Sequence, residues 1–190
     1  MYEATEIRWH GRGGQGAVTA AKLFAQSAMA GGKYVQAFPE FGPERTGAPV
    51  KAYNRISSKK LTIHCGVTNP HIVVVVDPTL VGTTDFTEGT DEKAVFLVNT
   101  KDDPAAVRNK IKLKGGKIYT IDATRISLET IGKPIPNTAM LGALAKVSGI
   151  VDIKRVLEDV KEDFEKKFPE KITQKNLEAV KRAYEEVKGE

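Results

Sequence analysis

A glycine-rich hexapeptide near the start of the chain has a spacing with direct chemical meaning. It consists of Gly11, Arg12, Gly13, Gly14, Gln15 and Gly16. Three of its glycines fit the pattern G-x-G-x-x-G, in which the first permits a tight turn, the second lets a phosphate approach the backbone, and the third lets helix and strand pack closely. Free N–H groups at the start of the following helix favour an anion. The pattern predicts an anion site, in which Arg12 would clamp a phosphate, or a turn that serves packing alone.

A dinucleotide site would need one more group, an acidic residue at the end of the second strand that binds the ribose hydroxyls. Such a residue lies about 20 positions after the glycines. Here that region holds Gln36, and Glu40 lies beyond the predicted end of the strand. No arginine occupies this position to suit a 2′-phosphate. A self-contained NAD(P)-binding reductase is therefore the weaker alternative.

The segment PEFGPERTGAP, which follows the second predicted strand, is dense in glycine and proline and carries both charge signs. It contains Glu44 and Arg45. One interpretation is an ion pair that stiffens the loop. The other is a contact made by Arg45 with a ligand or partner, because a planar guanidinium suits phosphate or carboxylate.

The histidines and the cysteine show no recognised metal-ligand or nucleophile spacing. His10 ends the first predicted strand, and His64 and Cys65 are adjacent further along the chain. We therefore expect both histidines to be buried or hydrogen-bonded, and Cys65 to be a small core residue. Asp77 follows a run of valines, at the end of a strand where ligand sites of α/β proteins tend to lie.

Alternating strands and helices must position these residues. The predicted strands cover residues 5–10, 33–38, 72–76, 94–98 and 117–121, and residues 50–56 and 61–63 are predicted to form a hairpin with 57–60 as its turn. The predicted helices cover residues 16–30, 104–112, 138–148, 153–167 and 174–187. Asn137, Asp152 and Thr173 are placed to cap the last three helices.

This alternation predicts an α/β fold, and the continuous β-branched run at 72–76 is typical of a parallel strand covered on both faces. The sequence predicts a single Rossmann-like domain over residues 1–190, with a mainly parallel sheet, helices on both faces and a β-hairpin excursion. The two charged helices at the end are predicted to form an outer layer with a solvated surface. An assembly face is the alternative for them.

Composition restricts the class of protein further. The 190 residues are 41% hydrophobic and 28% charged, with a formal net charge of +5, which is typical of one globular domain. Residues 1–60 hold 9 Lys and Arg against 4 Asp and Glu. The positive excess therefore accompanies the glycine loop and favours an anionic ligand or an acidic partner surface.

Several partners and cofactors are not expected. Basic residues are not interleaved with aromatic ones, so we expect no nucleic-acid binding. Without a long apolar run or a signal segment, we expect no membrane contact and a cytoplasmic location. The single cysteine excludes an iron–sulfur cluster held by this chain alone, because such clusters take about four thiolates.

The same residues carry a resemblance to a known family. The stretches EIRWHGRGGQGAVTAAKLFA and KYVQAFPEFGPERTGAPVKAYNRIS resemble the gamma subunits of pyruvate:ferredoxin oxidoreductase and related 2-oxoacid:ferredoxin oxidoreductases. The motifs DPTL at Asp77 and NTAMLG at Asn137 fit the same family. The glycine loop taken together with FGPERTG is far more specific than the glycines alone, and the α/β pattern is compatible along the whole chain.

The resemblance implies a multisubunit enzyme of anaerobic metabolism. Such an enzyme decarboxylates a 2-oxoacid, here most simply pyruvate, on thiamine diphosphate with Mg, reduces ferredoxin through [4Fe–4S] clusters, and transfers the acyl group to coenzyme A. The alpha and beta subunits hold thiamine diphosphate, and the beta and delta subunits hold the clusters. This chain would then bear no catalytic residue and no metal.

The resemblance also suggests what the marked residues would contact. The glycine loop, Glu44 and Arg45 would contact coenzyme A or the catalytic subunits. Asn137 is first of all a helix cap, with a cofactor contact as the second interpretation. A pure scaffold subunit, in which the glycine loop only packs, is the remaining alternative.

Overall fold

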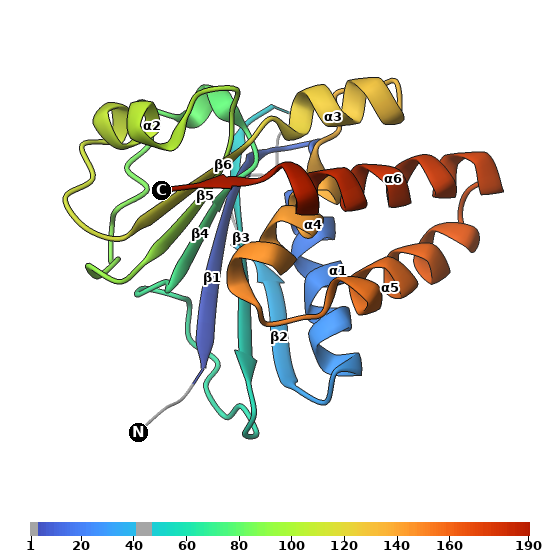
Figure 1. Ribbon diagram of the computed structural model, residues 1–190. Coiled ribbons are helices and arrows are strands. Elements are labelled where there is room, and N and C mark those ends of the chain that lie inside the picture. The colour runs from blue at the N-terminus through green and yellow to red at the C-terminus, as the bar shows by residue number, and fades with distance from the viewer. Residues whose placement is uncertain (1–3, 41–46) are drawn as a thin grey trace.

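A sheet of seven strands forms the centre of the computed structural model, which describes residues 4–40 and 47–190 (Figure 1). The strands of this described part are β1 Thr5–Arg12, β2 Tyr34–Pro39, β3 Pro49–Ser57, β4 Ile72–Val75, β5 Val95–Asn99, β6 Lys117–Ile121 and β7 Lys188–Gly189. They lie in the order β2-β3-β1-β4-β5-β6-β7. β1, β4, β5 and β6 are parallel, whereas β3 is antiparallel to both β1 and β2, and β7 is antiparallel to β6. The predicted α/β fold with a mainly parallel central sheet is confirmed.

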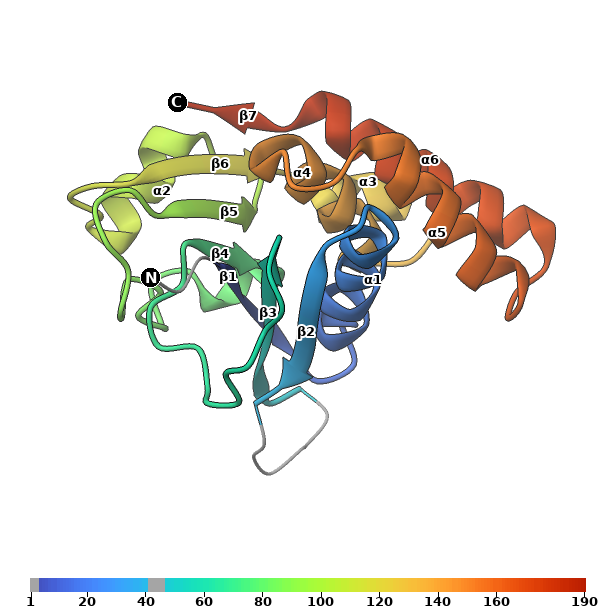
Figure 2. The ribbon, with the colours of Figure 1, turned by 90° about the horizontal axis from the view of Figure 1, so that it is seen from below.

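Helices cover both faces of the sheet, as predicted. They are α1 Ala17–Ala30, α2 Pro104–Ile111, α3 Ala123–Thr130, α4 Asn137–Ser148, α5 Ile153–Glu165 and α6 Glu170–Glu186, with a short 3₁₀ turn η1 at Pro78–Leu80. Figure 2 shows α1, α3, α4, α5 and α6 together on one side and α2 on the other. In the part of the chain that the structure describes, no helix combines the length and apolarity needed to cross a membrane.

Alternation along β1 sends its side chains to two different environments. Ile7 and Trp9 are fully buried in the large core beneath α1 and α4, because successive side chains of a strand point to opposite faces. Arg8 and His10 therefore point to the other face, where loops rather than a long helix cover β1. On the helical side the Trp9 indole donates to Asn54 Oδ1 at 2.7 Å, and the Asn54 amide donates to the Ala21 carbonyl at 2.8 Å. These bonds fasten α1 to the sheet.

The charged helices at the end of the chain are more deeply integrated than an outer layer. α6 fully buries Ala179, Val180 and Ala183. Where it crosses α4, a Cβ on Gly142 would lie 2.0 Å from the Val180 carbonyl oxygen, so only glycine permits this approach. α5 fits the predicted outer layer better, because Val156 and Val160 are the buried residues among its 13.

The predicted hairpin is wrong in one of its strands. β3 forms as expected, but residues 61–63 form no strand, and β3 instead pairs with β2 and β1. The hairpin excursion is therefore β2–β3. The short 61–63 segment is held differently: the Gln36 side-chain amide donates to the Ile63 carbonyl at 2.9 Å.

Helix starts were predicted with mixed success. Asp152 caps α5 by accepting a hydrogen bond from the Lys154 amide at 2.7 Å, as expected. Thr173 does not cap α6, because the helix begins earlier, at Glu170 after Pro169, and buries Thr173 within it. α3 and β7 were not predicted. Asp122 caps α3 by accepting from the Arg125 amide at 2.9 Å.

Candidate functional site

The carboxyl ends of β1 and β4 lie side by side at one end of the sheet and define the candidate site. After β1 the chain continues to β2 and β3 on one side of β1, whereas after β4 it continues to β5 on the other. Such a change of direction is where ligands bind in open α/β sheets. The glycine loop follows β1, and Asp77 follows β4 (Figure 1). The structure thus brings together two segments that the sequence marked separately.

Two glycines of the loop, Gly11 and Gly16, have different roles from those predicted. Gly11 lies within β1 and makes no tight turn; a Cβ there would lie 3.0 Å from the Ala17 Cβ, so Gly11 serves the packing of strand against helix. The turn spans Arg12 to Gln15, closed by the Gln15 amide donating to the Arg12 carbonyl at 3.1 Å. Gly14 within it and Gly16 at the start of α1 have φ angles of 93° and 77°, in the left-handed region that favours glycine. A Cβ on Gly16 would lie 2.4 Å from Asn137 Nδ2. The packing role expected of Gly16 is thus a contact with α4.

A polar network ties the loop to the end of β4. Gln15 donates through Nε2 to Asp77 Oδ2 at 2.6 Å, and its Oε1 accepts from the Arg12 amide at 2.8 Å. Asp77 Oδ1 accepts from the Thr79 amide at 2.7 Å. Arg12 Nε lies 3.2 Å from Asp77 Oδ2. Gln15 therefore bridges the two segments, and Asp77 is the centre of the network.

The charges of this network are matched. Asp77 is buried, which acts to raise its pKa, but hydrogen bonds from Thr79 and Gln15 and the charge of Arg12 outweigh burial and lower the pKa. The Arg12 guanidinium also donates to Thr79 Oγ1 at 3.2 Å and to the Gly47 carbonyl at 3.1 Å. Its side chain keeps 33% of its surface exposed. An oriented cation thus stands at the mouth of the site.

Asn137 lies beside the glycine loop, although its predicted role as a helix cap is wrong. It is the first residue of α4, and Pro136 occupies the capping position. Asn137 Oδ1 accepts from the adjacent Thr138 amide at 2.9 Å, which leaves Nδ2 directed at the loop beside Gly16. The side chain that the family motif singled out is therefore part of the same site.

The loop amides are largely used within the chain. The amides of Arg12, Gly13 and Gln15 donate to Gln15 Oε1, the Ala48 carbonyl and the Arg12 carbonyl. These three N–H groups do not point at an open anion position. Other donors at the site include the Arg12 guanidinium, the Asn137 amide and the first turn of α1, whose cap Gly16 supplies no side-chain bond.

The prediction of burial is right for His10 but wrong for His64 and Cys65. His10 is buried as expected, packs edge-on against Phe86 with ring centroids 4.9 Å apart, and has no partner for Nε2. Burial, with the charges of Arg8 and Lys51, lowers its pKa to about 3. His64 and Cys65 are exposed, contrary to prediction. Their loop lies outside the core because the Arg55 guanidinium occupies the space beneath it, donating to the Gly66 carbonyl at 2.8 Å.

Two predicted site residues cannot be placed. Glu44 and Arg45 lie outside the described residues. Within the ranges 4–40 and 47–190, no group of three His, Cys, Asp or Glu side chains could hold a metal ion.

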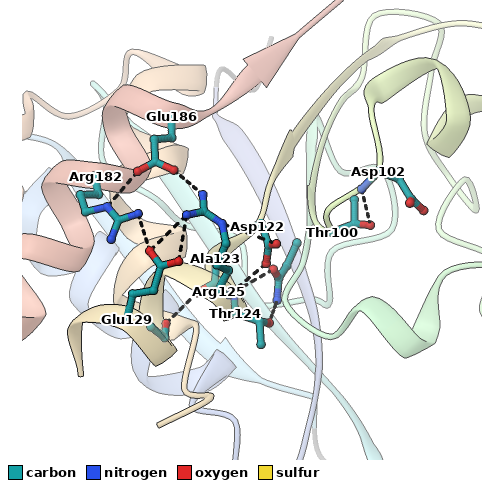
Figure 3. A network of polar contacts seen from close by, with 11 residues as sticks. Thr100, Asp102, Asp122, Ala123, Thr124, Arg125, Glu129, Arg182 and Glu186 are labelled. Atoms are coloured by element: carbon teal, nitrogen blue, oxygen red, sulfur yellow. Dashed lines mark hydrogen bonds and ion pairs between the residues drawn. The ribbon is translucent and has the colours of Figure 1, made fainter. Parts of the chain in front are cut away.

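At the same end of the sheet, a second polar network lies beyond the carboxyl ends of β5 and β6. The sequence did not predict it. Arg125 of α3 pairs with Glu186 of α6 at 2.5 Å and with Glu129 at 3.1 Å, and Arg182 pairs with both carboxylates at 2.8 Å (Figure 3). The ring fastens α3 to the end of α6. Its charges are mutually satisfied, so this network is structural.

Thr79 is the site residue that sequence analysis missed. The DPTL motif contained the available signal, since an Asp before Pro at a strand end favours a turn in which the Asp side chain accepts the amide two residues on. That turn sets the Thr79 hydroxyl against Arg12. The pairing of Arg12 with Thr79 depends on the sheet order, which the sequence did not determine.

Comparison with known proteins agrees with this architecture. The family model described as pyruvate ferredoxin/flavodoxin oxidoreductase matches residues 6–186. The chain belongs to this family. The resemblance in the motifs is thereby confirmed, and within the family the chain is a gamma subunit of the pyruvate and 2-oxoacid ferredoxin oxidoreductases.

Relatives match along nearly the whole chain. Pyruvate synthase subunit PorC of Thermotoga maritima is 49% identical over 183 residues, covering 96% of this chain and 94% of the relative. The common gamma subunit of the pyruvate/ketoisovalerate oxidoreductases of Pyrococcus abyssi is 49% identical and covers 95% of each chain. The crystal structure of the Thermotoga maritima pyruvate oxidoreductase subunit has a TM-score of 0.87 at 46% identity and covers 99% of both chains.

A more distant structure shows the fold alone. The 2-oxoglutarate:ferredoxin oxidoreductase of Magnetococcus marinus is 21% identical, with a TM-score of 0.77 over 96% of this chain and 31% of that one. The same fold therefore also occurs as part of a longer chain.

Proposed function

We propose that this gamma subunit assembles with alpha, beta and delta subunits into a cytoplasmic enzyme that decarboxylates pyruvate or a related 2-oxoacid, forms acyl-coenzyme A and reduces ferredoxin. The names of the relatives support the substrate class, since they include pyruvate synthase and pyruvate/ketoisovalerate oxidoreductases. A single cysteine does not fit a [4Fe–4S] cluster. The clusters, thiamine diphosphate and its Mg therefore belong to the other subunits in this proposal.

We assign to this subunit a contact with the phosphate groups of coenzyme A, made by Arg12 and the start of α1. The observation that carries the assignment is the fixed, partly exposed guanidinium of Arg12. Asp77, Thr79 and Gly47 hold it in place through Nε and through bonds from each terminal nitrogen. A guanidinium has five N–H donors, so one hydrogen on each terminal nitrogen stays available for a phosphate oxygen.

The start of α1 adds a second favourable feature. Its cap, Gly16, has no side chain, and its first turn contains no acidic residue. The N–H groups of that turn and the helix dipole therefore favour a negative charge. The Asn137 amide lies beside this turn and is a further donor for the ligand.

The internal bonding of three loop amides favours a second candidate, a scaffold subunit. In that case glycine is required at positions 11 and 16 because Ala17 packs against Gly11 and Asn137 packs against Gly16. Self-contained NAD(P) binding has less support, because β3 lies between β1 and β2. Gln36 stands at the position of the ribose-binding acid, but its side chain donates to the Ile63 carbonyl and accepts from Arg55.

The experiment is Arg12→Ala in the complete enzyme, with Arg155→Ala as control. Arg155 is paired with Asp159 on the outer helix α5, far from the loop in sequence and in the fold. Loss of a charged hydrogen bond of about 1.5–3 kcal/mol corresponds to a rise in KM for coenzyme A of roughly 10- to 150-fold. Decarboxylation measured without coenzyme A should be unchanged.

The other outcomes separate the alternatives. An intact complex with an unchanged KM for coenzyme A would refute the contact of Arg12 with coenzyme A and favour the scaffold function. Loss of assembly in Arg12→Ala, with assembly retained in Arg155→Ala, would make Arg12 an interface residue.

A further inference from the structure

The two edges of the sheet are finished in different ways. At one edge the chain's own end covers β6: β7 pairs with it, the Glu190 amide donates to the Ile118 carbonyl at 3.4 Å, and Glu190 Oε1 accepts from the Ile118 amide at 2.8 Å. Arg108 pairs with Glu190 and holds it there. The other edge is β2, which has a sheet neighbour only in β3 among the described strands (Figure 2).

The hydrogen-bond register shows which backbone groups of β2 face outward. The Glu40 amide donates to the carbonyl of Lys51, the residue directly opposite. In an antiparallel pair, hydrogen-bonded and non-hydrogen-bonded positions alternate. Gln36 and Phe38 therefore bond to β3, whereas the N–H and C=O groups of Val35 and Ala37 point away from the sheet.

This edge has only one of the features by which proteins protect a free strand, a proline at its end. Such edges carry charged side chains, bulges or proline, or are very short. β2 is six residues long and reads YVQAFP, without a charged residue. Its proline, Pro39, occupies an outward position, where no ladder bond to β3 is lost. Tyr34 at its start keeps 50% of its surface exposed, and tyrosine is enriched among residues that dominate interfaces.

We propose that β2 is a docking edge, along which an extended acidic segment of another subunit of the oxidoreductase adds as a further strand. Addition of a strand would satisfy the outward groups of Val35 and Ala37. The proposal rests on the assembly stated under the proposed function.

Charge favours a different, acidic chain over a second copy of this one. Lysines precede β2 and follow β3, at the end of the sheet where Tyr34 lies opposite Ser57. They are Lys33 and Lys60. At the other end, the Glu40 carboxylate is paired with Lys51 at 3.5 Å. A second copy would bring the same positive excess to the contact, whereas an acidic strand complements it.

The first test is amide hydrogen exchange resolved to single residues, on the chain alone and in the complete complex. The Val35 and Ala37 amides should exchange fast in the free chain and at least 100-fold more slowly in the complex. Gln36 and Phe38 are internal controls, because their amides are bonded to β3 in both states. If the complex forms and Val35 and Ala37 still exchange fast, the docking edge is refuted while the proposed function stands.

The second test is Ala37→Pro, which removes one outward N–H and no bond to β3, compared with Ala37→Ser, which keeps that N–H. Both variants should give the wild-type circular dichroism spectrum, and only Ala37→Pro should lose assembly, by at least 10-fold in apparent affinity. Equal assembly of the two would overturn the proposal. So would a dimer of the free chain in sedimentation that Ala37→Pro abolishes, because the occupant would then be a second copy. If the wild-type chain joins no complex, the proposed function fails and the docking edge fails with it.

Discussion

Substitution of Gly16 by alanine should destabilise the protein through two separable effects. The first is conformational: a φ of 77° costs an alanine about 1 kcal/mol. The second is steric, because the new Cβ would lie 2.4 Å from Asn137 Nδ2 and 3.0 Å from its Cγ. Asn137 must then rotate and give up the bond to the Thr138 amide, at a cost of about 1 kcal/mol. We expect a total loss of about 2–3 kcal/mol in the free energy of unfolding.

Gly14 provides the matched control. It also has a left-handed φ, 93°, but a Cβ there would meet nothing within 4 Å. Gly14→Ala should therefore show the conformational cost alone, about 1 kcal/mol. In the Asn137→Ala background, the cost of Gly16→Ala should fall to nearly that of Gly14→Ala, while the cost of Gly14→Ala should not change.

Urea unfolding of the three single variants, Gly14→Ala, Gly16→Ala and Asn137→Ala, and of the two double variants measures these differences. With a slope of about 2 kcal/mol per molar urea, Gly16→Ala should lower the midpoint by about 1 M, and the double-variant cycle should give a coupling of about 1 kcal/mol. Equal costs for Gly14→Ala and Gly16→Ala, both independent of Asn137, would refute the contact between the glycine loop and α4.

Two further predictions concern the core and the pH dependence of stability. Gly142→Ala should cost about 3 kcal/mol or more in the free energy of unfolding, since its Cβ would meet backbone of α6; Gly66→Ala, with open space around it, should be nearly neutral by the same urea assay. The pKa of His10 falls from 6.5 to about 3 on folding, so its neutral form is favoured in the folded state and stability is lost as pH falls below 6.5. Wild type should lose about 2–3 kcal/mol between pH 7 and pH 4.5. His10→Leu should lose much less over this range, and an equal loss in both would contradict the assignment; Asp77 does not contribute there, because its stabilisation is complete above pH 3.8.

The central elements were predictable because local signals and tertiary packing agree there. The valine run of β4 is buried on both faces, and α5 follows a capping aspartate with an apolar stripe that packs on the core. α3 was missed because its eight residues, ATRISLET, are too short for a clear period, although Asp122 was available as a cap. The prediction of a second hairpin strand at 61–63 was wrong because β2, which precedes β3 in the chain, pairs with the side of β3 that such a strand would need.

The site was predictable in its parts but not in its arrangement. The motif identified the glycines, Asp77 and Asn137 as functional candidates, and the structure brings them together. No local pattern predicts that Asn137 lies against Gly16, because that contact depends on how α4 packs over the end of β1. The exposure of Cys65 was equally unpredictable, since it follows from Arg55 lying beneath that loop.

The order of the strands explains why a dinucleotide-type glycine pattern has a different use here. In dinucleotide-binding folds, the loop amides face the pyrophosphate and an acid from the neighbouring strand holds the ribose. Here β3 is inserted next to β1, so β2 and Gln36 are displaced from that position, while Gln15, Ala48 and the loop itself take up three of the amides. What remains at the carboxyl ends of β1 and β4 is the positioned guanidinium of Arg12 beside the start of α1. In the proposed contact with coenzyme A, recognition would therefore depend on the charge and geometry of Arg12 more than on the glycine backbone, which is why Arg12→Ala tests this contact against a scaffold function.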